Sequence, residues 1–194
     1  MTNETDADRR QVTDAGRLRA LAHPLRVRLF HLVAEHEQLT ATQCAELVGE
    51  SPANCSFHLR TLAKHGFIER AEGHGREKPW RRVAASWDMR PEPADEASAL
   101  AAQSLALLTI DHAVAVSRAS FERLAAEADE WTQASTVTGS RFWATAEELA
   151  ELSRELQAIT DRFEGRSADP SKRPEGARPA RLLALAHPDL EESE

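Results

Sequence analysis

The chain has 194 residues, 41% of them hydrophobic, which is enough for one packed domain or two small ones. Its net charge of -8 is uneven, since residues 1–90 carry 14 Lys or Arg against 12 Asp or Glu, and residues 91–194 carry 10 against 20. The acidic second half excludes a uniformly basic coat for nucleic acid, so such a contact is expected in the first half.

The composition also indicates the cellular compartment in which the protein is expected. No stretch approaches about 18 apolar residues and the first residues are polar, so we expect neither a membrane span nor a signal peptide, and a cytoplasmic location. Cys44 and Cys55 are too few for a disulfide framework and are expected to be small core residues.

Two helices are predicted after a polar tail. Thr13 can cap a short first helix that contains Leu18, and Pro24 suits the first turn of a second helix that ends near Glu37. The second helix has a half-buried face of period 3.6, made by Leu25, Leu29, Leu32 and Val33.

A pair of shorter helices follows. Thr40 and Gln43 have the spacing of a capping box, and Cys44, Leu47 and Val48 are expected to face inward. Gly49 ends this helix, and Ser51-Pro52 begins the next one, whose apolar stripe is Cys55, Leu59 and Leu62. A turn of about three residues between two such helices is typical of a helix-turn-helix.

A β-hairpin is predicted directly after these helices. Residues 67–72 and 78–83 are the two strands, and Gly73-His74-Gly75 is the turn. A helix-turn-helix followed by a hairpin is a winged helix, and Arg76, Lys78, Arg81 and Arg82 would make this wing basic.

The second half is predicted to be helical. A long helix from about Asp95 to Trp131 has a heptad seam, and Thr145 caps a later helix that reaches Phe163. Residues 140–145 and 180–186 could form a short two-stranded sheet, although the second run also suits a helix. The expected fold is mainly α with a small β-hairpin. It divides into a disordered tail (1–12), a winged helix-turn-helix domain (13–85), a linker (86–94), a helical dimerisation and possible effector region (95–188) and an acidic tail (189–194).

Three segments of the first half carry a family resemblance, namely Leu21-Ala22-His23-Pro24-Leu25-Arg26, Ser56-Phe57-His58-Leu59-Arg60-Thr61-Leu62 and Gly66-Phe67-Ile68-Glu69. Together they resemble the ArsR-like winged-helix regulators, and the rest looks like the longer branch of that family with a C-terminal pairing region. The resemblance implies a dimer whose fourth helix enters the major groove while each wing lies along the backbone or minor groove.

The residues themselves favour the same interpretation, because a helix with one buried stripe can present its other face to the base edges. The predicted DNA-binding residues are Ser51, Asn54, Ser56, Phe57, His58, Arg60, Lys64, Arg76 and Lys78. The predicted dimer interface is Leu18, Leu100, Leu107, Val114 and Phe121, and an intrachain hairpin with residues 149–163 is the alternative use of this seam.

Other activities find little support in the sequence. Thr40 and Thr42 stand where the thiolates of a Cys-x-Cys metal sensor of this family would fall, and His112 has no partners at metal-ligand spacing, so no metal and no cofactor is expected. Catalytic motifs are missing. We therefore expect a homodimeric repressor that binds double-stranded DNA, with an apolar effector near Trp131, Phe142 and Trp143 as a further candidate partner. The alternative is a winged helix that binds protein instead of DNA.

Overall fold

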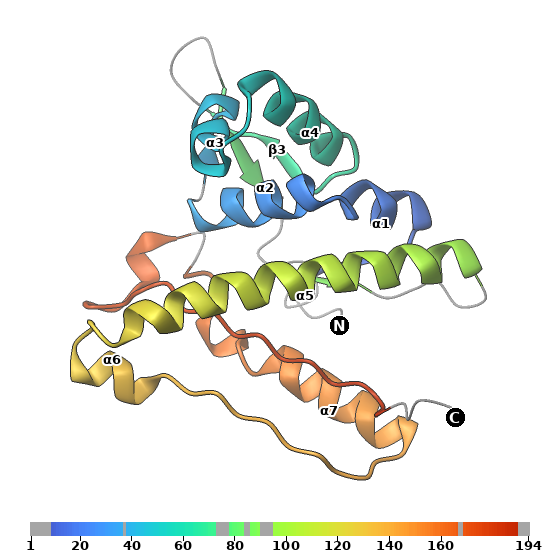
Figure 1. The fold of residues 1–194 in the computed structure, drawn as a ribbon, viewed down its shortest axis with the longest axis vertical. Helices are drawn as coiled ribbons and strands as arrows, with labels where there is room; N and C mark the ends of the chain where they lie inside the picture. Colours follow the sequence, from blue (N-terminus) through green and yellow to red (C-terminus); the bar gives the residue numbers. More distant parts are fainter. Residues whose placement is uncertain are drawn as a thin grey trace. The chain divides into compact units, whose positions relative to one another are not determined.

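The computed structural model describes residues 9–36, 38–72, 78–83, 86–89, 95–166 and 169–189. The chain divides into two compact units, Met1–Ala119 and Ser120–Glu194. The described residues of the first unit contain helices α1 to α4 and most of α5, with α3 and α4 at one end and the start of α5 along the other (Figure 1). Its fold is the predicted one, mainly helical with a small antiparallel sheet.

The first two helices form the base of the first unit. Helix α1 (Ala15–Leu21) is capped by Asp14, whose Oδ1 accepts the backbone N–H of Arg17 at 2.8 Å, so the cap is one residue later than predicted. Helix α2 (Pro24–Glu35) begins at the predicted proline. Leu18 was predicted at the dimer interface, but it is fully buried in this core and cannot contact a second chain, so that prediction is wrong.

Helices α3 (Ala41–Val48) and α4 (Pro52–Lys64) are the predicted helix-turn-helix pair. The capping box of Thr40 and Gln43 is complete, and Gly49 ends α3 with a φ of 73°, a left-handed conformation that glycine adopts without strain. Leu47 was expected to face inward but is 53% exposed, whereas Cys44 and Cys55 are fully buried as predicted.

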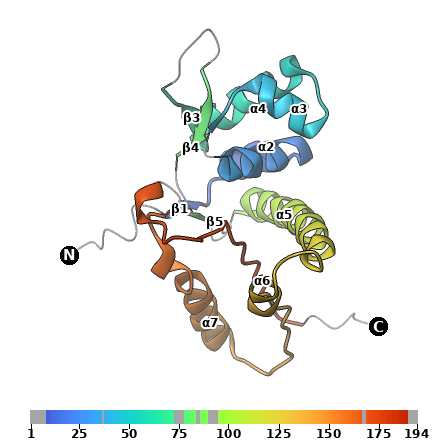
Figure 2. The same cartoon turned by 90° about the vertical axis from the view of Figure 1, so that its left-hand side faces the viewer.

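The predicted hairpin is confirmed as part of a three-stranded antiparallel sheet. Strands β3 (Ile68–Arg70) and β4 (Trp80–Arg82) pair with each other, and β4 also pairs with β2 (Gln38–Leu39). The sheet order is therefore β2-β4-β3, and Figure 2 shows the hairpin beside α4. The predicted turn, Gly73-His74-Gly75, lies outside the described residues, as does Arg76.

A two-stranded sheet between the N-terminal residues and the segment after the wing was not predicted. Strand β1 (Arg9–Val12) pairs in parallel with β5 (Ser86–Met89), so residues expected in a disordered tail and a linker are ordered against each other. The short polar β1 has little sequence signal of its own, because its partner strand is more than 70 residues away in the chain.

The long helix α5 (Glu96–Leu124) ends seven residues before the predicted Trp131, and a short α6 (Asp129–Ala134) follows it. The start of α5 belongs to the core of the first unit through Ala101 and Leu105. Ser98 is fully buried there, and its hydroxyl donates to the carbonyl of Thr13 at 2.6 Å.

By length and composition alone, α5 is also apolar enough to cross a membrane, although no membrane span was predicted from the sequence. The apolar residues of α5 lie on two opposite sides of the helix. At 100° per residue, Leu107 lies almost opposite the buried Leu105, and Leu107 is 58% exposed. One side of α5 therefore packs in the first unit, and the other side is an uncovered apolar stripe.

The second unit contains α6, α7 (Ala146–Ala158) and two short 3-10 segments, Asp161–Phe163 and Pro170–Lys172. Thr145 and Glu148 form the predicted capping box of α7. The sheet predicted from residues 140–145 and 180–186 is absent from the described residues, since both runs are extended but unpaired.

Candidate nucleic-acid interface

The outward face of α4 is a stripe of three side chains. Phe57, Arg60 and Lys64 are exposed and follow one another at steps of three and four residues, which places them on one side of the helix. The opposite side of α4, Cys55, Leu59 and Leu62, is fully buried, so the rotation of the helix about its axis is determined by its packing. Asn54 and Ser56 lie at the edges of the stripe and are partly exposed.

The start of α4 is held by two side-chain hydrogen bonds. Ser51 accepts the backbone N–H of Asn54 at 3.2 Å, so the Ser51 hydroxyl is engaged as the helix cap. The amide of Asn54 donates to Glu50 at 3.0 Å. Glu50 was not among the predicted site residues, and it orients the Asn54 side chain at the edge of the outward stripe.

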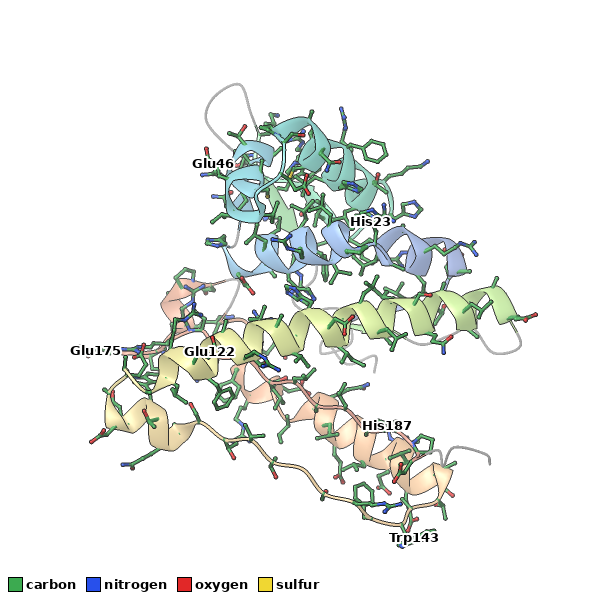
Figure 3. All side chains as sticks on the ribbon, viewed as in Figure 1. His23, Glu46, Glu122, Trp143, Glu175 and His187 are labelled. Atoms are coloured by element: carbon green, nitrogen blue, oxygen red, sulfur yellow. The ribbon has the colours of Figure 1, made fainter. Side chains whose placement is uncertain are left out.

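His58 does not belong to this face. It is only 7% exposed and lies 100° around the helix from Phe57, with its ring centroid 4.6 Å from that of His23. Figure 3 labels His23 at the junction of α1 and α2, on the side that faces α4. The prediction that His58 contacts DNA is therefore wrong, because the side chain packs inside the unit.

The surroundings of His23 and His58 favour the neutral form of both rings. Burial, reinforced by the nearby Arg26 guanidinium, lowers the pKa of His23, and burial together with His23 and Arg26 lowers the pKa of His58, which Glu50 only partly offsets. His23 also caps α2 by accepting the backbone N–H of Leu25 through Nδ1 at 3.2 Å, which requires that nitrogen to be unprotonated.

The first unit is accordingly expected to lose stability as the pH falls. An unfolded histidine titrates near pH 6.5. Because the folded pKa values of His23 and His58 are lower, the stabilisation is complete above about pH 6.5 and is lost as the pH falls through the folded values. Urea denaturation at a series of pH values measures the trend, and proton NMR titration of the two rings assigns it. A midpoint that is constant or rises on acidification in this window would contradict the prediction.

The wing is less basic than its sequence suggests. Arg81 forms an ion pair with Glu69 on the neighbouring strand at 2.8 Å, and the Arg82 guanidinium lies 4.6 Å from the centre of the Phe30 ring. Arg70 lies over the Trp80 ring at 3.7 Å. Lys78 is exposed and is the described wing cation that remains suited to a phosphate.

Two arginines that the sequence analysis did not single out hold the helix-turn-helix together. Nε of Arg17 donates to the carbonyl of His65 at 3.2 Å, joining α1 to the end of α4. A guanidinium nitrogen of Arg28 donates to the carbonyl of Val48 at 3.3 Å, joining α2 to the end of α3. Cations at helix C-termini also favour the local dipole, but an arginine on a half-exposed helix has no sequence signal that reveals such a partner.

The described residues contain no group of three His, Cys, Asp or Glu side chains that could hold a metal ion. Burial and the charge of Glu50 raise the pKa of the Cys55 thiol, which disfavours its thiolate form. His112, considered as a metal ligand above, stacks on His31 with ring centroids 4.6 Å apart.

Two helices across a short turn, the second with a buried stripe and an exposed one, define a helix-turn-helix protein of the class that regulators use on DNA. Residues 21–71 match a family described as a helix-turn-helix domain, and with the sheet that follows α4 this part of the chain has the fold of a winged helix-turn-helix. A solved structure, a double mutant of ZitR from Lactococcus lactis in apo form, is 18% identical, covers 73% of this chain and 82% of its own, and has a TM-score of 0.30.

Proposed function

We propose that the protein is a sequence-specific transcriptional repressor that binds duplex DNA as a homodimer. In this proposal α4 enters the major groove, where each base pair presents a distinct pattern of donors, acceptors and methyl groups. Arg60 reads a guanine, Phe57 contacts a thymine methyl group, and Asn54, Ser56 and Lys64 contact the bases and phosphates at the edges. Lys78 and Arg76 of the wing bind the backbone or the minor groove.

The single observation that supports the proposal most is the outward stripe of α4. Phe57 is 58% exposed although it lies one residue from the core position His58, and two cations continue its stripe. One exposed aromatic residue is ordinary on a protein surface. An aromatic residue aligned with Arg60 and Lys64 on the second helix of a helix-turn-helix can contact a thymine methyl group while the cations reach guanine or phosphates.

The dimer is proposed on the uncovered stripe of α5. Leu100, Leu107, Val114 and Phe121 recur every seven residues and are 58%, 58%, 45% and 43% exposed. A second copy packed on this stripe through a two-fold axis would present two α4 helices to half-sites one DNA turn apart, about 34 to 36 Å.

The test separates base recognition from backbone contact. Arg60→Ala is expected to weaken operator binding by about 1 to 3 kcal/mol and to relax the preference at one base position. Lys78→Ala is expected to weaken operator and random DNA alike and to flatten the salt dependence by about one unit of log-log slope. Mobility-shift titrations at several salt concentrations, on an operator selected from genomic fragments, measure both effects.

Both side chains are exposed, so both variants are expected to remain folded and dimeric, which circular dichroism and sedimentation check. If both retain the wild-type affinity for DNA, α4 is not the recognition helix. A winged helix that binds protein would then explain the exposed Phe57 better.

A further inference from the structure

The described part of the C-terminal unit lacks a core of its own. Of its described residues, 120–166 and 169–189, not one is buried. Helix α7 is well formed, with a complete capping box and an apolar stripe of Leu149, Leu152 and Leu156, yet this stripe is only partly covered, and Ile159 and Phe163 beyond it are 46% and 50% exposed. A helix of 13 residues is marginal in water without packing, so α7 needs a partner surface.

Two extended segments of the same unit also have exposed apolar side chains. Residues 135–145 and 177–189 contain no helix or strand, and both can be followed in Figure 1 before α7 and toward the C-terminus. An ion pair between Arg141 and Asp189 at 2.9 Å joins them. Their large apolar side chains are exposed, at 82% for Val137, 54% for Phe142, 102% for Trp143, 56% for Leu182, 39% for Leu183 and 55% for Leu185. Trp143, labelled in Figure 3 just before α7, is the extreme case.

The connection before α7 favours a second chain over the same chain as the partner. Helices that pack on their own neighbours are usually joined by about 2 to 8 residues. Here 11 extended residues, 135–145, separate α6 from α7, and at about 3.3 Å per residue they can reach roughly 36 Å. Exchange of an identical element between protomers is a low-cost route to a dimer, and an arm of this length is long enough to reach a second copy.

The acidic charge of the C-terminal unit and its place next to the α5 stripe both agree with a second copy of the chain as the partner. The unit contains 16 Asp or Glu against 9 Lys or Arg, which disfavours nucleic acid or an anionic membrane as its partner. The stripe proposed as the dimer seam continues along α5 to Phe121, the second residue of this unit. A copy held by that seam would therefore bring its own C-terminal unit close.

We propose that residues 120–189 form their core only together with the same residues of a second copy, by exchanging α7 and the two extended segments. The inference rests on the homodimer of the proposed function, and it adds that dimerisation and folding of this unit are one event. The first unit has its own core and is expected to stay folded when the copies separate.

The inference is tested by measuring the hydrogen-exchange rates of the full chain at several protein concentrations. We expect residues 135–145 and 177–189 to be protected when the protein is dimeric by sedimentation, and to exchange at least about tenfold faster when dilution separates the copies. Free-peptide exchange rates in a dimer would overturn the inference and leave the α5 seam as the sole interface. A chain that is monomeric at all concentrations would overturn both the inference and the proposed dimer.

A crosslinking experiment identifies the partner chain. A photo-reactive phenylalanine derivative replaces Trp143, and isotopically heavy and light copies are mixed before irradiation. Crosslinked peptide pairs that combine heavy and light halves are expected. Pairs that are purely heavy or purely light in a mixed dimer would mean that α7 and its arms fold on their own chain, which overturns the exchange.

A matched pair of variants links the protection to α7. Leu152→Glu places a charge on the apolar stripe and is expected to abolish the protection of both extended segments, while the circular dichroism of the first unit is retained. Ala150→Glu places the same charge on an exposed position of the same helix and is expected to behave as the wild type. Equal protection in both variants would overturn the inference.

Discussion

Replacing Leu107 and Val114 with glutamate is expected to convert the dimer to a monomer and to weaken operator binding by about 100-fold or more, because binding through two linked half-sites gains roughly that factor. Both side chains are exposed on the outer stripe of α5, at 58% and 45%. In a dimer they would be covered, and an unpaired carboxylate in an apolar interface is strongly destabilising. In the separated chain the same carboxylates would meet water, so the first unit is expected to remain folded.

Sedimentation and mobility shift measure the two parts of this result. The matched control is Ala106→Glu with Ala115→Glu, which adds the same two charges at exposed positions on the flanks of the stripe. The control is expected to remain a dimer and to bind DNA. A Leu107→Glu/Val114→Glu chain that is still dimeric at micromolar concentration would show that the copies pair elsewhere.

Trp80→Ala is expected to lower the free energy of unfolding by about 3 to 5 kcal/mol, the usual cost of removing a large aromatic side chain from a core. Trp80 is 4% exposed in β4, the central strand of the sheet, and the Arg70 guanidinium covers its ring. The loss is a large fraction of the roughly 5 to 15 kcal/mol that stabilises a typical domain, so DNA binding is expected to weaken as well.

Trp80→Phe is the matched variant. Among the described residues the buried indole N–H of Trp80 has no hydrogen-bond acceptor, so phenylalanine keeps an aromatic ring and removes an unsatisfied donor. We expect it to be much less costly than alanine. Urea denaturation followed by circular dichroism measures both, and equal losses for alanine and phenylalanine would show that the ring itself does not support the wing.

The helix-turn-helix could be predicted from the sequence because its signals are local. Thr40 with Gln43, Gly49 and Ser51-Pro52 act within one or two turns of their own helices, and the structure contains each helix where these residues place it. The alternation of Cys55, Leu59 and Leu62 with outward residues also determined which side of α4 is buried.

The errors concern partners that lie far away in the chain. His58 is on the flank of α4, where a side chain can be either exposed or buried. Its ring is buried because it packs against the ring of His23. Leu18 and Leu107 are both leucines on amphipathic helices. Leu18 is buried because α1 packs in the core, whereas Leu107 is exposed because it lies on the outer side of α5. Likewise β1 exists because Ser86–Met89 supplies its hydrogen bonds.

The sequence alone therefore determined the helices, their caps and the order of a winged helix, since these depend on neighbours within about four residues. Only the tertiary structure decided which wing cations are engaged with other side chains. Arg81 and Lys78 look equivalent in the sequence, yet the antiparallel register of β3 and β4 places Arg81 opposite Glu69, with which it forms an ion pair, whereas Lys78 is exposed. Cross-strand pairing depends on register, which is set by the buried face of the whole sheet and not by either residue.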